Sequence, residues 1–287
     1  MHLKSIFNPA LLFLITALVS ACGDSSATTS EQTSYESVQT ASYKVEYIPV
    51  TSAFEGKTAF KLRLTTLSDG KPAPGKSISL APKMTMTSMS HTTPFDALKD
   101  NGDGTYSSTI YYLMASTMAG GISMGSWELK FTINGESATF NPTVAMSMGT
   151  TPKISLKGIN DKIGSMLGGM SSRSYYLFND GISGSTAKLF VAAADDSTMM
   201  NYPAVSVGTT LAGLTVTDMT VEVSADKNSW TTLTDDGKGH WSKTGLAALT
   251  AGTHLYVRLT VNGEQKTTDG AAVGVTNACG DFTVAGM

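Results

Sequence analysis

The sequence of 287 residues is poor in several residue types, and each shortage excludes a class of protein. It has only two cysteines, Cys22 and Cys279, so no set of disulfides can hold the fold together and packed cores must supply the stability. Charged residues make up 15% of the chain and the formal net charge is −3, whereas nucleic-acid binding needs a basic patch. Beyond Cys22 no apolar run reaches the length that spans a bilayer.

Motifs that carry catalysis are also missing. The sequence has no H-E-x-x-H, no G-x-S-x-G and no phosphate-binding glycine loop. Asp100-Asn-Gly-Asp-Gly104 is similar to a calcium loop, but Tyr111 stands at the twelfth position, where such a loop needs a bidentate Glu. His240 and His254 have no partners for a catalytic set near them in the sequence, and we interpret His240 as a strand-surface residue. We therefore predict that the protein is not an enzyme.

Residues 1–21 have the pattern of a signal peptide, with an apolar run over Ala10–Val19 that is too short to span a membrane. The run ends in Leu18-Val-Ser-Ala-Cys22, which resembles the lipobox of bacterial lipoproteins. The resemblance implies that the chain is cut before Cys22 and that Cys22 carries a lipid. The protein would then be attached to a membrane through this lipid. Gly23 after the cysteine favours the outer over the inner membrane. The alternative is an ordinary secretory signal that happens to end near a cysteine.

The rest of the chain has the pattern of β-structure. Residues 22–42 are mostly small and polar, which predicts a disordered tether after the lipidated cysteine. From residue 43 onward apolar and polar residues alternate, as in Phe60–Leu64, Trp127–Ile133 and Leu255–Val261, and this is the period of a half-buried strand. Asn-Gly and Asp-Gly pairs separate such runs and predict hairpin turns. The fold class we predict is all-β.

An internal repeat predicts two domains. Asp100–Ser107 matches Asp235–Ser242 at an offset of 135 residues, and Leu129–Glu136 matches Val257–Glu264 at an offset of 128. A repeat of this length fits two tandem immunoglobulin-like β-sandwiches. We place the first at residues 43–150 and the second at residues 151–287. If Cys22 carries lipid, Cys279 is a free thiol, which we interpret as buried and apolar.

Methionines are concentrated where the two repeats differ. The first repeat has seven extra residues between the matched blocks, in a segment that contributes three methionines, and a second group lies just upstream. The candidate metal ligands from the two groups are Met84, Met86, Met89, His91, Met114, Met118 and Met124.

Thioether sulfur with imidazole suits Cu(I), which is the cofactor we expect. Trp127, close in sequence, could cover a monovalent cation with its ring. On one regular strand Met84 and Met86 would share a face while Met89 and His91 pointed to the other, so the four can meet only if a turn or bulge falls between Met86 and Met89. Two alternatives remain open: the methionines fill the core, or they form a surface that grips a partner protein.

The first repeat resembles the YtkA-like/FixH-like domain family. The resemblance lies in Pro82-Lys-Met-x-Met-x-x-Met-x-His91, in Gly104-Thr-Tyr106 and in Met124-Gly-Ser-Trp-Glu-Leu129, and it covers about residues 43–145. It implies an immunoglobulin-like sandwich in the bacterial envelope, with a role in copper handling or cytochrome oxidase assembly. The Met114–Met124 insertion and the second domain depart from that family.

These observations predict a cell-envelope lipoprotein that binds Cu(I) in its first domain. An envelope metalloprotein or a surface protein would be its partner, and the second domain would act as a spacer or a partner-binding module. The alternative function is a structural or adhesive surface lipoprotein whose domains contact a protein or glycan without metal.

Overall fold

The computed structural model describes residues 36–165, 168–195 and 201–284. The predicted signal peptide, the lipidation site Cys22 and the tether up to residue 35 lie outside the described residues. Strands, turns and bends account for the regular structure of the described ranges, which contain no helix. Accordingly, no helix within those ranges could cross a membrane. The predicted all-β class is confirmed.

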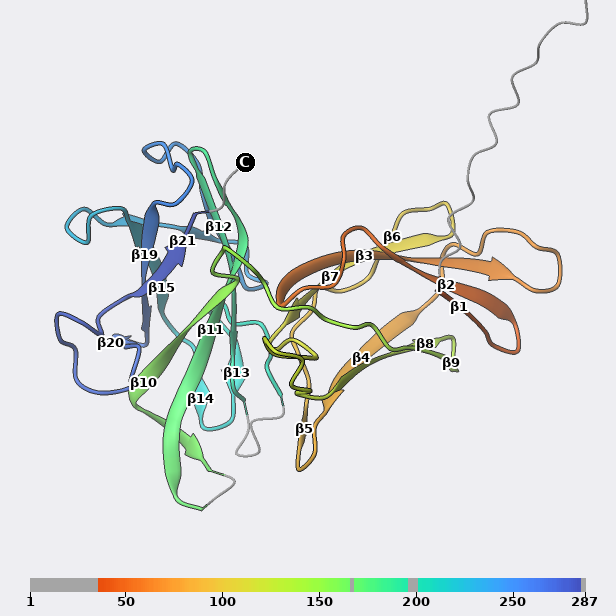
Figure 1. Ribbon diagram of the computed structural model, residues 1–287, viewed down its shortest axis with the longest axis horizontal. Coiled ribbons are helices and arrows are strands. Elements are labelled where there is room, and N and C mark those ends of the chain that lie inside the picture. The colour runs from red at the N-terminus through yellow and green to blue at the C-terminus, as the bar shows by residue number, and fades with distance from the viewer. Residues whose placement is uncertain (1–35, 166–167, 196–200, 285–287) are drawn as a thin grey trace, which may run out of the picture. The chain divides into compact units, whose positions relative to one another are not determined.

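The first repeat forms a sandwich of two antiparallel sheets, whose strands Figure 1 labels. One sheet has the order β1 (Glu36–Gln39), β2 (Tyr43–Pro49), β3 (Gly56–Thr66), β7 (Thr105–Tyr112) and β6 (Lys99–Asp100). The other has the order β5 (Ser90–His91), β4 (Ile78–Thr85), β8 (Ser126–Ile133) and β9 (Glu136–Phe140). Alternate residues of both sheets point inward and form one core. In this core the rings of Phe60 and Phe131 meet edge to face, with their centroids 5.8 Å apart.

The folded part begins earlier than the sequence predicts. Strand β1 pairs along its whole length with β2, and Ser42 donates from its backbone N–H and its hydroxyl to the carboxylate of Glu136 at 2.9 and 2.6 Å. The prediction of a tether up to residue 42 is therefore wrong for residues 36–42. These residues include a strand at the edge of a sheet, where few side chains need to be apolar. Their polar composition therefore gave no sign of the strand in the sequence.

The second repeat forms a sandwich of the same kind. Its first sheet has the order β10 (Lys153–Gly164), β11 (Met170–Ser183), β12 (Thr186–Ala193), β18 (His240–Lys243) and β17 (Thr234–Asp235). Its second sheet has the order β16 (Thr231–Thr232), β15 (Met219–Ser224), β19 (His254–Val261) and β20 (Glu264–Gln265), with β21 (Gly280–Thr283) also paired to β19. A small hairpin adds β13 (Thr210–Leu211) and β14 (Leu214–Thr215).

The predicted repeat corresponds to equivalent hairpins. The turn between β8 and β9 is Asn134-Gly135 and that between β19 and β20 is Asn262-Gly263, with φ of 47° at Asn134 and 50° at Asn262. Asn tolerates this left-handed conformation better than most residues, which is why Asn-Gly predicts the turn correctly.

Side chains of both repeats form a third hydrophobic cluster. Tyr111 at the end of β7 stacks on Phe190 of β12, with ring centroids 4.0 Å apart and planes 3° from parallel, and Phe178 of β11 packs beside both. The described residues accordingly belong to one compact unit. The two repeats thus share an apolar contact in addition to their own cores.

Candidate functional site

A tight turn brings the first methionine group together with its histidine. Strand β4 ends at Thr85, the N–H of Met86 donates to the carbonyl of Met89 at 2.9 Å, and β5 then returns along β4. The turn that the sequence required between Met86 and Met89 is present. Met84 therefore pairs with His91 across β4 and β5, and with Trp127 across β4 and β8.

Directly paired residues of antiparallel strands point to the same face. The side chains of Met84, His91 and Trp127 therefore gather on one face of the sheet, where they are 0%, 7% and 1% exposed. The imidazole meets the indole edge to face, with ring centroids 5.4 Å apart and planes at 87°. A thioether, an imidazole and an indole thus share one dry location.

The His91 ring is held in one tautomer. Its Nδ1 lies 2.7 Å from the carbonyl oxygen of Thr92, which can only accept, so Nδ1 carries the proton and donates it. Nε2 is then an unprotonated acceptor. It is buried and has no hydrogen-bond partner among the described residues. Burial also lowers the pKa of His91 below its ordinary value of 6.5, so the ring is neutral at pH 7.

An imidazole in this state is prepared to bind a metal. Metal-ligating histidines commonly donate the second ring N–H to a backbone carbonyl, which fixes the tautomer and directs the other nitrogen at the ion. Leaving a buried acceptor unpaired costs free energy, about 1–3 kcal/mol. A soft cation at Nε2 would recover that cost.

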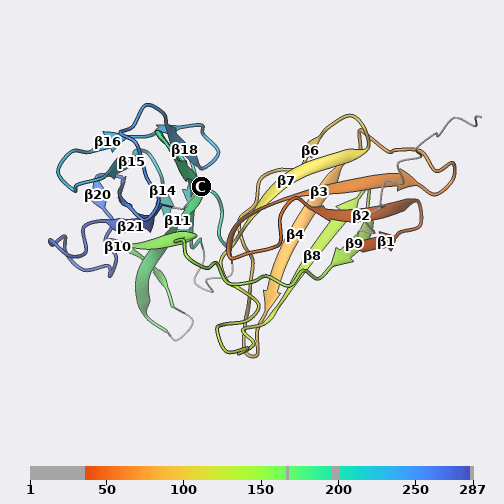
Figure 2. The same cartoon turned by 45° about the horizontal axis from the view of Figure 1, so that its top comes forward.

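Three further methionines lie against the same core. Met86, Met114 and Met124 are partly buried and pack on the cluster that contains Met84. The indole N–H of Trp127 donates to the carbonyl of Met114 at 3.0 Å, which holds the start of the methionine loop (residues 113–125) against the site. The loop ends beside β4, since a Cβ on Gly125 would lie 2.4 Å from the carbonyl oxygen of Thr85. Figures 1 and 2 both place this loop at the same end of the sandwich as the β4–β5 hairpin.

The structure does not bring every candidate ligand into this set. Met89 is 41% exposed at the turn and Met118 is 49% exposed in the loop. The buried group is therefore His91 with Met84. Met86, Met114 and Met124 are partly buried against the same core, while Met89 and Met118 lie at the surface. No group of three or more His, Cys, Asp or Glu side chains that could hold a metal occurs within the described ranges. The set at His91 consists of thioethers and one imidazole, which are soft or borderline ligands.

One residue of the site was missed by sequence reasoning. Tyr202, in the segment after β12, is buried and lies edge to face with His91, at 6.2 Å between centroids and 86° between planes. It belongs to the second repeat, and no local pattern marks it as a neighbour of His91.

The sequence predicts that His240 is a strand-surface residue, and it is the first residue of β18, partly exposed. Its ring also joins the two repeats, since Nε2 lies 2.9 Å from Asp96 and Nδ1 lies 3.1 Å from Asp180. Hydrogen bonds to Asp180 and Asp96 raise the pKa of His240 to about 10, so the ring is a cation at neutral pH. Tyr111 and Lys57 also donate to Asp180, at 3.0 and 2.8 Å. A charged network between the two repeats thus borders the third hydrophobic cluster.

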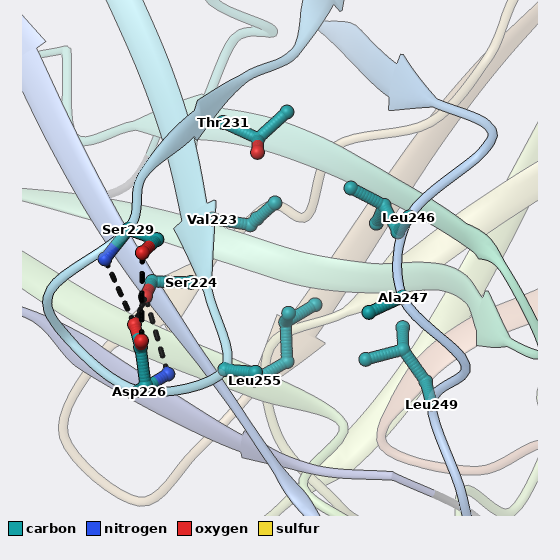
Figure 3. Close-up of a pocket in the computed structure, with 10 residues that line it drawn as sticks. Val223, Ser224, Asp226, Ser229, Thr231, Leu246, Ala247, Leu249 and Leu255 are labelled. Atoms are coloured by element: carbon teal, nitrogen blue, oxygen red, sulfur yellow. Dashed lines mark hydrogen bonds between the residues drawn. The ribbon is translucent and has the colours of Figure 1, made fainter.

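Two other features carry no comparable chemistry. A hollow of about 260 Å³ in the second sandwich is lined by leucines and by Val223, with Asp226 at its edge (Figure 3). The Asp226 carboxylate is already occupied by the backbone N–H groups of Ser229 and Asn228, which lower its pKa to about 2. Cys279 is half-buried and burial raises the pKa of its thiol, which favours the protonated form over a metal-binding thiolate.

No protein-family model matches the chain, and no curated protein matches it significantly. Among solved structures, the chain is similar to the Escherichia coli adhesin FdeC, at 13% identity over 88% of this chain and 67% of that one, with a TM-score of 0.27. The Yersinia pseudotuberculosis adhesin InvE matches at 13% identity over 82% of this chain and 58% of that one, with a TM-score of 0.26. Titin domains A168–A170 match at 10% identity over 79% of this chain and 95% of that one, with a TM-score of 0.22. Likenesses this distant concern the immunoglobulin-like fold alone.

Proposed function

We propose that this protein is a non-enzymatic lipoprotein of the cell envelope that binds Cu(I) in its first sandwich. The observation that supports the metal site best is the unprotonated, buried Nε2 of His91, which has no partner among the described residues and lies on the same face as Met84. His91 and Met84 would hold the ion, with Met86, Met114 and Met124 as the further thioether ligands.

The ligand set selects for a soft, weakly charged ion. Thioethers are neutral and soft, and imidazole suits copper, whereas Mg²⁺ and Ca²⁺ require oxygen ligands. A dry site built of neutral groups admits a monovalent cation at lower desolvation cost than a divalent one. Trp127, which is buried against His91, adds an aromatic ring of the kind that attracts such a cation. The resemblance of this repeat to YtkA-like/FixH-like domains leads to the same proposal.

The proposal of a lipid anchor rests on the sequence. The lipobox-like Leu18–Cys22 supports a lipid anchor at Cys22, and Gly23 supports the outer membrane. A Cu(I) site on an anchored protein would serve copper handling or delivery, and the partner would be an envelope metalloprotein.

The experiment is a Cu(I) titration of the unlipidated mature chain, residues 22–287, under reducing conditions against a chromophoric chelator. Cys22 and Cys279 are both replaced by Ser in every sample, because either thiol would itself bind Cu(I). We expect one Cu(I) per chain, and an affinity more than about tenfold weaker in His91→Gln. Met84→Leu and Met86→Leu should also weaken binding, since leucine keeps the volume and removes the sulfur.

Met148→Leu is the matched control, because Met148 is 84% exposed and lies outside the buried set. Wild-type affinity in His91→Gln would overturn the site. Failure of the parent chain to compete with even a weak chelator would overturn copper binding altogether.

The alternative is a structural or adhesive lipoprotein that binds a protein or glycan. What favours it is the firm attachment of the two sandwiches through Tyr111, Phe190 and the His240 network. Tandem domains fixed in this way suit a protein that presents a binding surface. Absence of copper binding would leave this function as the proposal.

A further inference from the structure

We propose that the second sandwich completes the metal site of the first, with Tyr202 as the residue that closes it. This inference rests on the proposed Cu(I) site at His91, and it assigns the second repeat a direct role in that site in place of a spacer.

The His91 ring lies between two aromatic rings that come from different repeats. The ring of Trp127, on β8, lies 5.4 Å from the imidazole between centroids, with the two planes at 87°. The ring of Tyr202 lies 6.2 Å from it, with the planes at 86°. Tyr202 is itself supported by Tyr176 of β11, whose ring lies 5.6 Å away at 74°. The imidazole is 7% exposed, with one aromatic ring from each repeat against it.

Met114 provides a second link between the site and the other repeat. It packs against the core of the first sandwich and also against the third cluster, which contains Tyr202, Phe178 and Phe190. One candidate ligand is thus in contact with the same apolar surface that carries Tyr202. A displacement of that surface would move the ligand as well as uncover the histidine.

Closure of this kind has a chemical purpose for Cu(I). Water and oxygen promote loss and oxidation of the ion, and a site sealed by apolar and aromatic groups excludes both. Nε2 of His91 has less than 1 Å² of exposed surface, so a solute or an acceptor protein can reach it only if a neighbouring group moves. Tyr202 is the aromatic neighbour that the second repeat supplies. The charged network of Asp96, His240 and Asp180 also links the two repeats, next to the third cluster that contains Tyr202.

The first test uses the metal-free mature chain and diethylpyrocarbonate, which acylates an accessible, unprotonated imidazole nitrogen. The rate is followed at His91 by peptide mass spectrometry. We expect slow reaction in the parent chain, a several-fold faster reaction in Tyr202→Ala, and the parent rate in Tyr202→Phe, which keeps the ring. Tyr256→Ala is the matched control, because Tyr256 lies on β19, where it pairs with Ser224 and Asp281.

The second test measures release of bound Cu(I) to excess chelator. Tyr202→Ala should release the ion several-fold faster than the parent, Tyr202→Phe and Tyr256→Ala. Circular dichroism melting confirms that each variant is folded, and Tyr202→Leu replaces the alanine variant if that one unfolds.

The outcomes separate the two proposals. A parent chain that takes up no Cu(I) refutes the proposed function, while the acylation rates still test closure by Tyr202. A parent chain that binds Cu(I), with unchanged His91 acylation and unchanged release in Tyr202→Ala, refutes closure and leaves the metal site standing.

Discussion

His240 and Asp96 are 144 positions apart in the chain, yet Nε2 of the histidine lies 2.9 Å from a carboxylate oxygen of the aspartate. The contact joins the β17–β18 hairpin of the second repeat to the segment before β6 in the first repeat. Asp180 holds the second ring nitrogen, so one cation is shared by two carboxylates. Such a hydrogen-bonded group makes the attachment of the two sandwiches depend on the charge of one ring.

The first prediction is a pH dependence. The folded-state pKa of His240 is about 10 and its ordinary value is 6.5, so its stabilising contribution is complete below pH 6.5 and is lost as pH rises through about 10. The melting temperatures of the parent and of His240→Gln should therefore differ most near pH 6 and converge toward pH 10. Water partly screens the ring, which is 26% exposed, so the difference will be modest. A constant difference across this range would contradict the assignment.

The second prediction concerns the stacked pair Tyr111 and Phe190. Tyr111→Ala removes a fully buried ring at the contact between the repeats and should lower the free energy of unfolding by about 3–5 kcal/mol. Tyr111→Phe keeps the ring and loses only the hydroxyl that donates to Asp180, so about 1 kcal/mol is expected. Urea denaturation measures both. Equal effects of the two substitutions would show that stacking contributes little.

The third prediction concerns buried charge in the second sandwich. Arg173 is 1% exposed and its Nε donates to Asp161 at 3.0 Å, while buried Lys266 lies 3.5 Å from the same carboxylate. Asp161→Ala leaves Glu264 as the remaining anion beside two buried cations and should cost about 3–5 kcal/mol. Lys71→Ala breaks an exposed pair with Asp69 and should cost less than about 1 kcal/mol. Comparable losses in the two variants, measured by urea denaturation, would be inconsistent with this account.

The fourth prediction uses two glycines of the methionine loop. Gly125 has φ of +147°, and a Cβ there would meet the Thr85 carbonyl and approach the Met84 methyl to 3.2 Å. Gly125→Ala should therefore distort the end of β4, destabilise the fold and weaken Cu(I) binding. Gly120 has φ of +85° with no atom near its Cβ position, so Gly120→Ala carries backbone strain alone, about 1 kcal/mol. Thermal melts and the copper titration compare them, and equal copper affinities would count against the placement of Met84 in the site.

The sequence predicts features that depend on local patterns. Alternation located strands such as β3, and Asn134-Gly135 located a hairpin because its backbone conformation requires those residue types. Polar Ser37 and Gln39 concealed β1, since an edge strand needs few apolar residues.

The candidate site was predictable only in part. Residue chemistry was enough to select Met84 and His91 as candidates. The sequence showed that they could meet only if a turn fell between Met86 and Met89, but it could not show that the turn exists. The structure has this turn, which leaves Met89 exposed. Tyr202 and His240 reach their partners through packing between the repeats, which no short-range pattern encodes.

The two matched hairpins carry the same backbone hydrogen bond, from Asn101 N–H to the Thr105 carbonyl in one repeat and from Asp236 N–H to the His240 carbonyl in the other. Position 240 is thus the structural equivalent of position 105. The same backbone hydrogen bond closes the turn with threonine in the first repeat and with histidine in the second, so the hairpin does not depend on the side chain at this position. The imidazole that Asp96 and Asp180 share is therefore carried by a position whose side chain is free to serve the contact between the repeats.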